Sequence, residues 1–161
     1  MANPNIQARM ARLRAAPKHV KAAGGYAALL GLVSLLRACA YAYAGRIFLG
    51  KALLYAVPML LVFWYSGFSL RDRSRWGFVV LAVLALLPLF GMFVASVHLL
   101  RLVVEGTVAA NRGEAVVGIA GLCQLIVTGF FLRHFLASET RRYVWTAPPP
   151  AQPETPPEGQ P

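Results

Sequence analysis

Four long apolar stretches, separated by short groups of charged or turn-forming residues, dominate the hydropathy pattern of the chain. They are rich in Leu, Ala, Val, Gly and Phe and show no alternation of apolar and polar positions. A helix needs about 20 residues at about 1.5 Å each to cross a bilayer core, whereas membrane strands alternate. The stretches cover residues 22–44, 52–69, 76–100 and 115–136. The pattern therefore predicts an all-α membrane protein, a four-transmembrane-helix antiparallel bundle in residues 22–137.

The two ends of the chain differ from this apolar domain. Residues 1–21 are basic, and Ile6, Met10 and Leu13 follow one another at helical spacing, so this segment is either an interfacial helix on anionic lipid or a disordered tail. Residues 138–161 are expected to be a disordered Pro-rich tail. The part from Ala147 to Pro161 contains seven prolines and has no apolar face to bury.

Composition and charge fix the solvent and the orientation. Apolar residues make up 58% of the chain and charged residues 14%, against about 45–50% and about 25% in soluble domains. The net charge of +10 has an uneven distribution: with both termini cytoplasmic, eleven Lys and Arg lie in inside segments and four in outside loops. Because such residues are retained on the cytoplasmic side, we expect a multi-pass protein of the cell membrane, the bacterial inner membrane, with both termini in the cytoplasm. The positive charge is then explained by orientation in the lipid bilayer, and nucleic-acid binding is not needed to explain it.

A cleaved signal peptide is the alternative for the first span. A basic leader, an apolar run from Tyr26 to Leu36 and the small residues around Ala44 partly fit that pattern. A leader of 25 residues and the intervening Arg37 argue against it. Cleavage would leave three spans in the same orientation.

Ionisable residues in spans are costly and are candidates for function. Arg37 lies late in the first span, where its side chain could snorkel outward, and His98, Arg101 and Glu105 share one face at the outer end of the third. These residues, with Glu114 as a further candidate, predict either a polar vestibule for an anionic headgroup or small ligand, or an ion-pair cluster that ends the helices. Gln124 and Thr128 share a face of the fourth span, where hydrogen bonds to another helix are expected before a transport pathway.

Two further features concern helix shape and packing. Pro58 and Pro88 lie near the middles of the second and third spans, and either proline can kink its helix. Small residues recur every three or four positions along the first span and predict a face for helix packing or dimerisation. This face consists of Ala27, Gly31, Ser34, Ala38, Ala42 and Gly45.

The sequence lacks recognisable catalytic motifs. Cys39 and Cys123 are solitary, and there is no paired carboxylate, nucleophile elbow or phosphate-binding glycine loop. Haem between helices needs histidines at matched depth, which only His19 and His134 approach, at the edge of the bundle. We therefore expect no cofactor, no metal and no enzymatic activity.

Two patches carry a resemblance. The segments from Phe68 to Trp76 (FSLRDRSRW) and from Phe131 to Tyr143 (FLRHFLASETRRY) resemble uncharacterised small four-helix bacterial inner-membrane proteins. The resemblance implies location and topology but no activity. The first hypothesis is a non-enzymatic accessory or scaffold subunit that associates with itself or with a membrane-protein partner. The alternative is a small transporter or ligand-binding membrane protein that uses the outer polar cluster and the Gln124 face.

Overall fold

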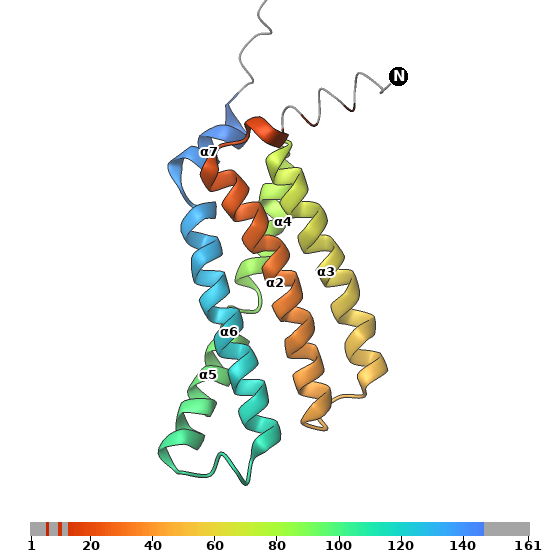
Figure 1. The fold of residues 1–161 in the computed structure, drawn as a ribbon, viewed down its shortest axis with the longest axis vertical. Coiled ribbons are helices and arrows are strands. Elements are labelled where there is room, and N and C mark those ends of the chain that lie inside the picture. The colour runs from red at the N-terminus through yellow and green to blue at the C-terminus, as the bar shows by residue number, and fades with distance from the viewer. Residues whose placement is uncertain (1–5, 7–9, 11–12, 147–161) are drawn as a thin grey trace, which may run out of the picture.

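The computed structural model describes residues 6, 10 and 13–146. Helices are the only regular secondary structure in this part of the chain. Four crossings run the length of the bundle (Figure 1). The helices are α2 (Lys18–Tyr43), α3 (Leu49–Arg71), α4 (Arg75–Leu86), α5 (Leu89–Val104), α6 (Arg112–Phe135) and α7 (Ser138–Trp145). Helices α4 and α5 together form the third crossing. All four crossings are long and apolar enough to span a membrane, as expected for a multi-pass membrane protein.

The predicted spans agree with these helices to within four residues at each boundary. Local sequence explains several of the ends. Gly45 and Gly106 follow α2 and α5 with φ of +71° and +67°, the left-handed conformation in which glycine commonly ends a helix. Ser74 begins α4 because its Oγ accepts a hydrogen bond from the backbone N–H of Gly77 at 3.2 Å. Consecutive crossings pack against each other through α2 and α3, α3 and α4, and α5 and α6, as an antiparallel bundle with short connections requires.

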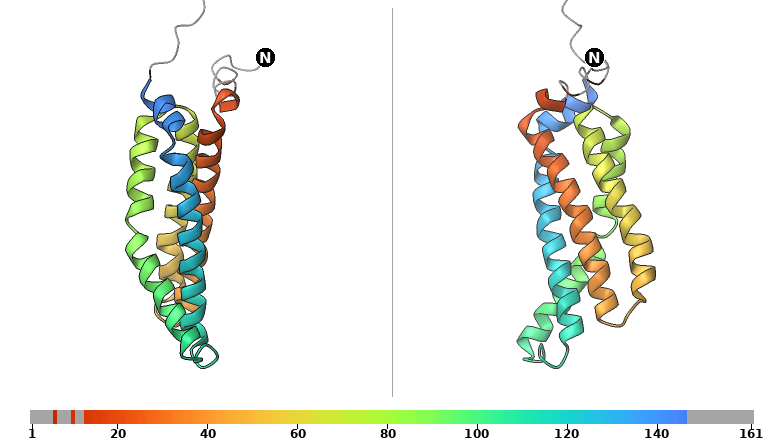
Figure 2. Two further views of the ribbon diagram at one scale, coloured as in Figure 1. Left: turned by 90° about the vertical axis from the view of Figure 1, so that its left-hand side faces the viewer. Right: turned by 45° about the vertical axis from the view of Figure 1, so that its right-hand side comes forward.

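The two prolines differ in their effect. Helix α3 continues through Pro58, whereas the third crossing is interrupted between Leu86 and Leu89, at Pro88. On one side of this break α4 packs against α3, and on the other side α5 packs against α6, so the third crossing changes its partner at the proline (Figure 2). Helix α2 occupies the centre, with extensive contacts to both α3 and α6.

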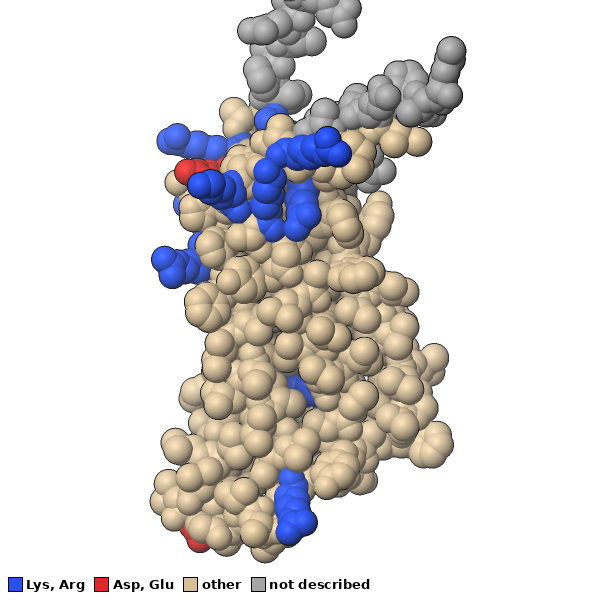
Figure 3. All heavy atoms as spheres, viewed as in Figure 1, with Lys and Arg blue, Asp and Glu red and all other residues tan. Residues whose placement is uncertain are grey.

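The core is concentrated in one half of the bundle. We call the end that carries α7 the α7 end, and the end formed by the α2–α3 and α5–α6 loops the hairpin end. Large buried side chains fill the bundle from its α7 end to its middle, and they include Phe63, Leu70, Leu81, Phe131 and Phe135. The rings of Phe131 and Phe135 stack at 4.9 Å between centroids. Lys and Arg gather around the α7 end, while the middle of the visible surface is almost entirely uncharged (Figure 3).

The prediction of disorder from residue 138 onward is wrong for its first part. Residues 138–145 form α7, which packs across the end of the bundle. Val144 is 3% exposed, and the hydroxyl of Tyr143 donates a hydrogen bond to the carbonyl of Arg71 at 2.8 Å. The guanidinium of Arg75 lies 5.2 Å from the ring centroid of Trp145. These aromatic and apolar side chains give residues 138–145 a face that packs on the end of the bundle.

Three expectations for the ends of the chain have different outcomes. Residues 147–161 lie outside the described part of the structure, as do residues 1–5, 7–9 and 11–12 of the segment in which an interfacial helix is one of the two expectations. The basic segment assigned to residues 1–21 overlaps α2, which already begins at Lys18, after Pro17. Helix α2 is therefore longer at its basic end than the hydropathy pattern predicts.

Candidate functional site

A cavity of about 400 Å³ lies in the half of the bundle nearer the hairpin end. It is bounded by α2, by α3 and by the interruption at Pro88, with Gln124 of α6 at one side. The fold explains its position. The third crossing packs on α3 through α4 but on α6 through α5, so the first half of α3 has few contacts with the third crossing. The volume is within the range of about 300–1,000 Å³ typical of small-molecule sites.

The wall of this cavity is mostly apolar. Side chains of α3 and of the α4–α5 break supply most of the lining, and they include Ala52, Ala56, Met59, Phe63 and Leu87. The lining residues that carry polar groups are Ser34, Arg37 and Tyr41 on α2, Tyr55 on α3 and Gln124 on α6. An apolar chamber with a few convergent polar groups is the usual form of a ligand site.

A hydrogen-bond network joins the polar side chains of α2 and α6. Nη1 of Arg37 donates to Oε1 of Gln124 at 3.2 Å, and Nη2 donates to the hydroxyl oxygen of Tyr41 at 3.2 Å. Nε2 of Gln124 donates to Oγ of Ser34 at 2.8 Å. Gln124 is only 3% exposed, so its amide connects α6 to two side chains of α2 inside the bundle. The predicted inter-helix hydrogen bonding of Gln124 is confirmed by these contacts.

The position of Arg37 differs from the prediction that its side chain extends outward. Gln124, which accepts from Arg37, is the thirteenth residue of α6 counted from the hairpin end and thus lies near the middle of that helix. Side chains on a helix tilt toward its N-terminus, which for α2 is the α7 end. The guanidinium therefore points toward the middle of the bundle.

Gly91 makes room for this guanidinium on α5. A Cβ atom at Gly91 would lie 3.2 Å from Nη2 of Arg37, closer than ordinary side-chain contacts allow. The sequence pattern did not indicate Gly91 or Tyr41 as part of the site. The spacing of four residues between Arg37 and Tyr41, which places them on one helix face, is the signal that could have identified Tyr41.

Thr128 serves packing between helices. Its hydroxyl donates to the carbonyl oxygen of Gln124 at 2.8 Å and lies 3.8 Å from Sδ of Met92 on α5. Thr128 is 1% exposed and is not among the residues that line the cavity. Its predicted role in helix contacts fits this position better than a role in a pathway.

The remaining members of the predicted polar cluster lie apart from the Arg37 network. Nε of Arg101 donates to Oε1 of Glu105 at 2.6 Å, an ion pair within one helix. His98 lies 3.6 Å from a carboxylate oxygen of Glu114, which also forms a two-pronged ion pair with Arg46. Glu114 is thus the centre of an ion-pair cluster near the hairpin end. The structure thus places Arg37 in a hydrogen-bond network of its own and the other predicted residues in ion pairs, the second of the two alternatives for this cluster.

A second cavity of about 370 Å³ connects this cluster with the Arg37 network. Arg46, His98 and Glu114 line it near the hairpin end, and Gly91 and Tyr41 line it as well. Tyr41 is thus shared by both cavities. Sequence reasoning missed Arg46, because it lies in a loop whose partner on α6 is 68 positions away.

The small-residue face of α2 packs within the chain. Ala27 is fully buried, and a Cβ atom at Gly31 would lie 2.9 Å from Leu60 of α3. Ser34 and Ala38 line the first cavity. Ala42 is partly buried, and the exposed Gly45 forms the turn after the helix. The predicted packing face is therefore used for contacts inside one molecule, chiefly with α3.

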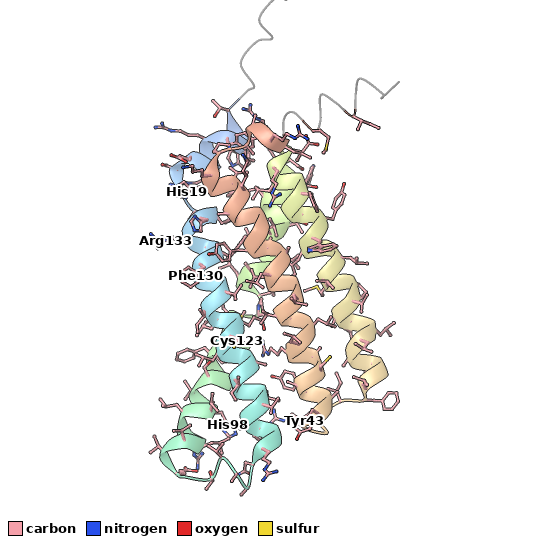
Figure 4. All side chains as sticks on the ribbon, in the orientation of Figure 1. His19, Tyr43, His98, Cys123, Phe130 and Arg133 are labelled. Atoms are coloured by element: carbon pink, nitrogen blue, oxygen red, sulfur yellow. The ribbon has the colours of Figure 1, made fainter. Side chains whose placement is uncertain are left out.

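Two histidines meet at the α7 end. Nδ1 of His19 and Nδ1 of His134 are 3.0 Å apart, and Tyr26 stacks on the ring of His134 at 5.5 Å between centroids. Glu139 of α7 lies 3.9 Å from Nε2 of His19. Figure 4 places His19 at this end and His98 at the opposite one. The similar depth expected for His19 and His134 agrees with their contact, which links α2 to α6.

The polar side chains described above could contact a ligand. Among residues 6, 10 and 13–146, no group of three or more His, Cys, Asp or Glu side chains could hold a metal ion. The Arg37 network offers hydrogen-bond donors and a fixed positive charge, since a guanidinium keeps its proton in proteins. Comparisons of the chain with protein-family models, with curated proteins and with solved structures found no match.

Proposed function

We propose that this chain is a non-enzymatic integral membrane protein that binds a ligand inside the bilayer, in the cavity beside Arg37. The observation that carries the proposal is a cavity of about 400 Å³ whose apolar wall is interrupted by one hydrogen-bonded polar group. Small-molecule sites combine these two properties, because the apolar wall supplies affinity and the polar group supplies orientation. We therefore assign ligand binding to the cavity at the α4–α5 break and not to the outer polar cluster.

A role as an accessory or scaffold subunit is the first hypothesis from the sequence, and it now ranks second. Two residues of the small-residue face that motivated it, Ala27 and Gly31, pack against α3 within the same molecule, and Ser34 and Ala38 line the cavity. Self-association or a membrane-protein partner would need a different surface. The ligand-binding hypothesis is therefore preferred, because it rests on a site that has both shape and polarity.

In the proposed orientation the bundle spans the inner membrane of a bacterium, and both termini lie in the cytoplasm. It is supported by the collection of Lys and Arg at the α7 end, because basic residues near short loops are retained inside (Figure 3). A reporter fused after Arg73, between α3 and α4, should then report the cytoplasm, and one fused after Arg112 the exterior. The opposite pair of results would overturn this orientation.

Filling the cavity is the direct test of the proposed function. Ala56 of α3 is 6% exposed and lines the cavity, so Ala56→Phe should exclude an amphiphilic ligand. Leu61 of the same helix is 58% exposed on the outside of the bundle, and Leu61→Phe is the matched control. The measurement is the amount of radiolabelled dodecanoate or dodecanol retained by protein in phosphatidylcholine nanodiscs, above that of empty discs. Equal retention of both probes by the two variants would refute binding in this cavity.

A further inference from the structure

The positive charge of Arg37 lacks a counter-charge in the described part of the chain. The ion pairs found there involve His19, Arg46, His98 and Arg101, and none includes Arg37. Its two hydrogen-bond acceptors, Gln124 and Tyr41, are neutral. A charge at this depth is unfavourable in a bilayer unless it is paired or hydrated. The network therefore orients the guanidinium without neutralising it.

The donors of the site exceed its acceptors. A guanidinium has five N–H groups, of which Gln124 and Tyr41 accept two, and Nε is buried with no hydrogen-bond partner. The hydroxyl oxygen of Tyr41 accepts from Arg37 and keeps its own hydrogen for donation. An acceptor-rich group with negative charge complements this arrangement, and an oxoacid anion has that chemistry.

The shape of the cavity adds a requirement for an apolar body. Ala52 and Phe63, which line its base, are 1% and 2% exposed. Tyr55 and Leu87, which line it from α3 and from the break before α5, are 64% and 74% exposed. Because these exposed side chains belong to helices within the apolar crossings, the mouth of the cavity faces the lipid between α3 and the break. A ligand that enters by this mouth comes from the bilayer.

From these observations we infer that the cavity binds a single-chain lipophilic oxoanion, such as a long-chain carboxylate, that enters sideways from the membrane. The inference rests on the proposed function and names its ligand class. The acid group pairs with Arg37 and accepts a hydrogen bond from Tyr41, and the chain lies against the apolar side chains of α3. A neutral amphiphile would fill the same cavity without neutralising the guanidinium.

The test compares three probes in the nanodisc assay: dodecanoate, the neutral dodecanol and water-soluble acetate. Each is measured on the full chain, on Arg37→Gln and on the control Arg101→Gln, which removes an exposed arginine paired only within its own helix. We expect the full chain and Arg101→Gln to bind dodecanoate at least about tenfold more tightly than dodecanol, and Arg37→Gln to lose this preference. Acetate should not compete, because it lacks the apolar chain. Circular dichroism shows whether each variant keeps its helices.

The outcomes separate the ligand class from the proposed function. Equal binding of dodecanoate and dodecanol, abolished by Ala56→Phe and unaffected by Arg37→Gln, overturns the inference and leaves a ligand-binding cavity. Competition by acetate as strong as by dodecanoate also overturns it, because the apolar body then contributes nothing. Binding of neither probe above empty discs removes both the inference and the proposed function. Should Arg37→Gln fail to fold, Tyr41→Phe replaces it, with a smaller loss of preference for dodecanoate expected.

Discussion

Gly24→Val is expected to destabilise the bundle by about 1–3 kcal/mol, the usual cost of forcing extra side-chain volume into a packed interface. A Cβ atom at Gly24 would lie 2.9 Å from the carbonyl oxygen of Gly67 and 2.7 Å from Nε of Arg71. The arginine side chain can move, but the backbone of α3 cannot move without separating from α2. Small residues let helix backbones approach in this way in membranes. Unfolding in an SDS titration, followed by far-ultraviolet circular dichroism, measures the effect.

The matched control is the next residue in the chain. A Cβ atom at Gly25 would meet no atom within 4 Å, and the residue is exposed. Gly25→Val therefore keeps the interface between α2 and α3 and should leave the free energy of unfolding equal or slightly higher, since valine favours a helix more than glycine does. If the two variants unfold at the same SDS fraction, the close approach at Gly24 does not govern the stability of this interface.

Gln124→Leu is expected to cost about 1.5–3 kcal/mol, the range for hydrogen bonds to charged groups. The substitution removes the acceptor of Arg37 and the donor to Ser34 at one step, and it leaves the guanidinium in an apolar setting. Loss of one partner of a buried charged contact generally costs more than loss of both. The same SDS titration provides the measurement.

A double-mutant cycle tests whether this cost comes from Arg37. The variant with both Arg37→Leu and Gln124→Leu should be more stable than the sum of the two single changes predicts, by about 0.5–3 kcal/mol. Strict additivity would mean that the two side chains do not interact energetically, whatever their separation. In that case the cost of Gln124→Leu would arise from Ser34 or from packing.

The sequence predicts the helices well because each crossing is an apolar run of adequate length, a property that depends on local composition alone. It predicts the packing role of α2 for the same reason, since small residues on one face are visible in the spacing. It does not predict that Pro88 interrupts a crossing while Pro58 does not. This difference depends on which neighbours the third crossing contacts, α3 on one side of the break and α6 on the other.

The site is less accessible to sequence reasoning than the helices are. The sequence indicates both Arg37 and Gln124 as candidates, but it does not indicate their contact, because they are 87 positions apart. The backbone position of Arg37 predicts a depth near the end of the helix, whereas its long side chain reaches a partner nearer the middle of the bundle. The cavity itself results from the divergence of α3 and α5 and has no signature in any one segment.

The central place of α2 has a consequence for biosynthesis. Chains fold from the N-terminal side as they are made, and α2 is the first of the four crossings to leave the ribosome. It is also the helix with extensive contacts to both α3 and α6, so it is already present when each of these partners is synthesised. The order of synthesis therefore makes α2 available before α3 and before α6, the two helices that pack on it.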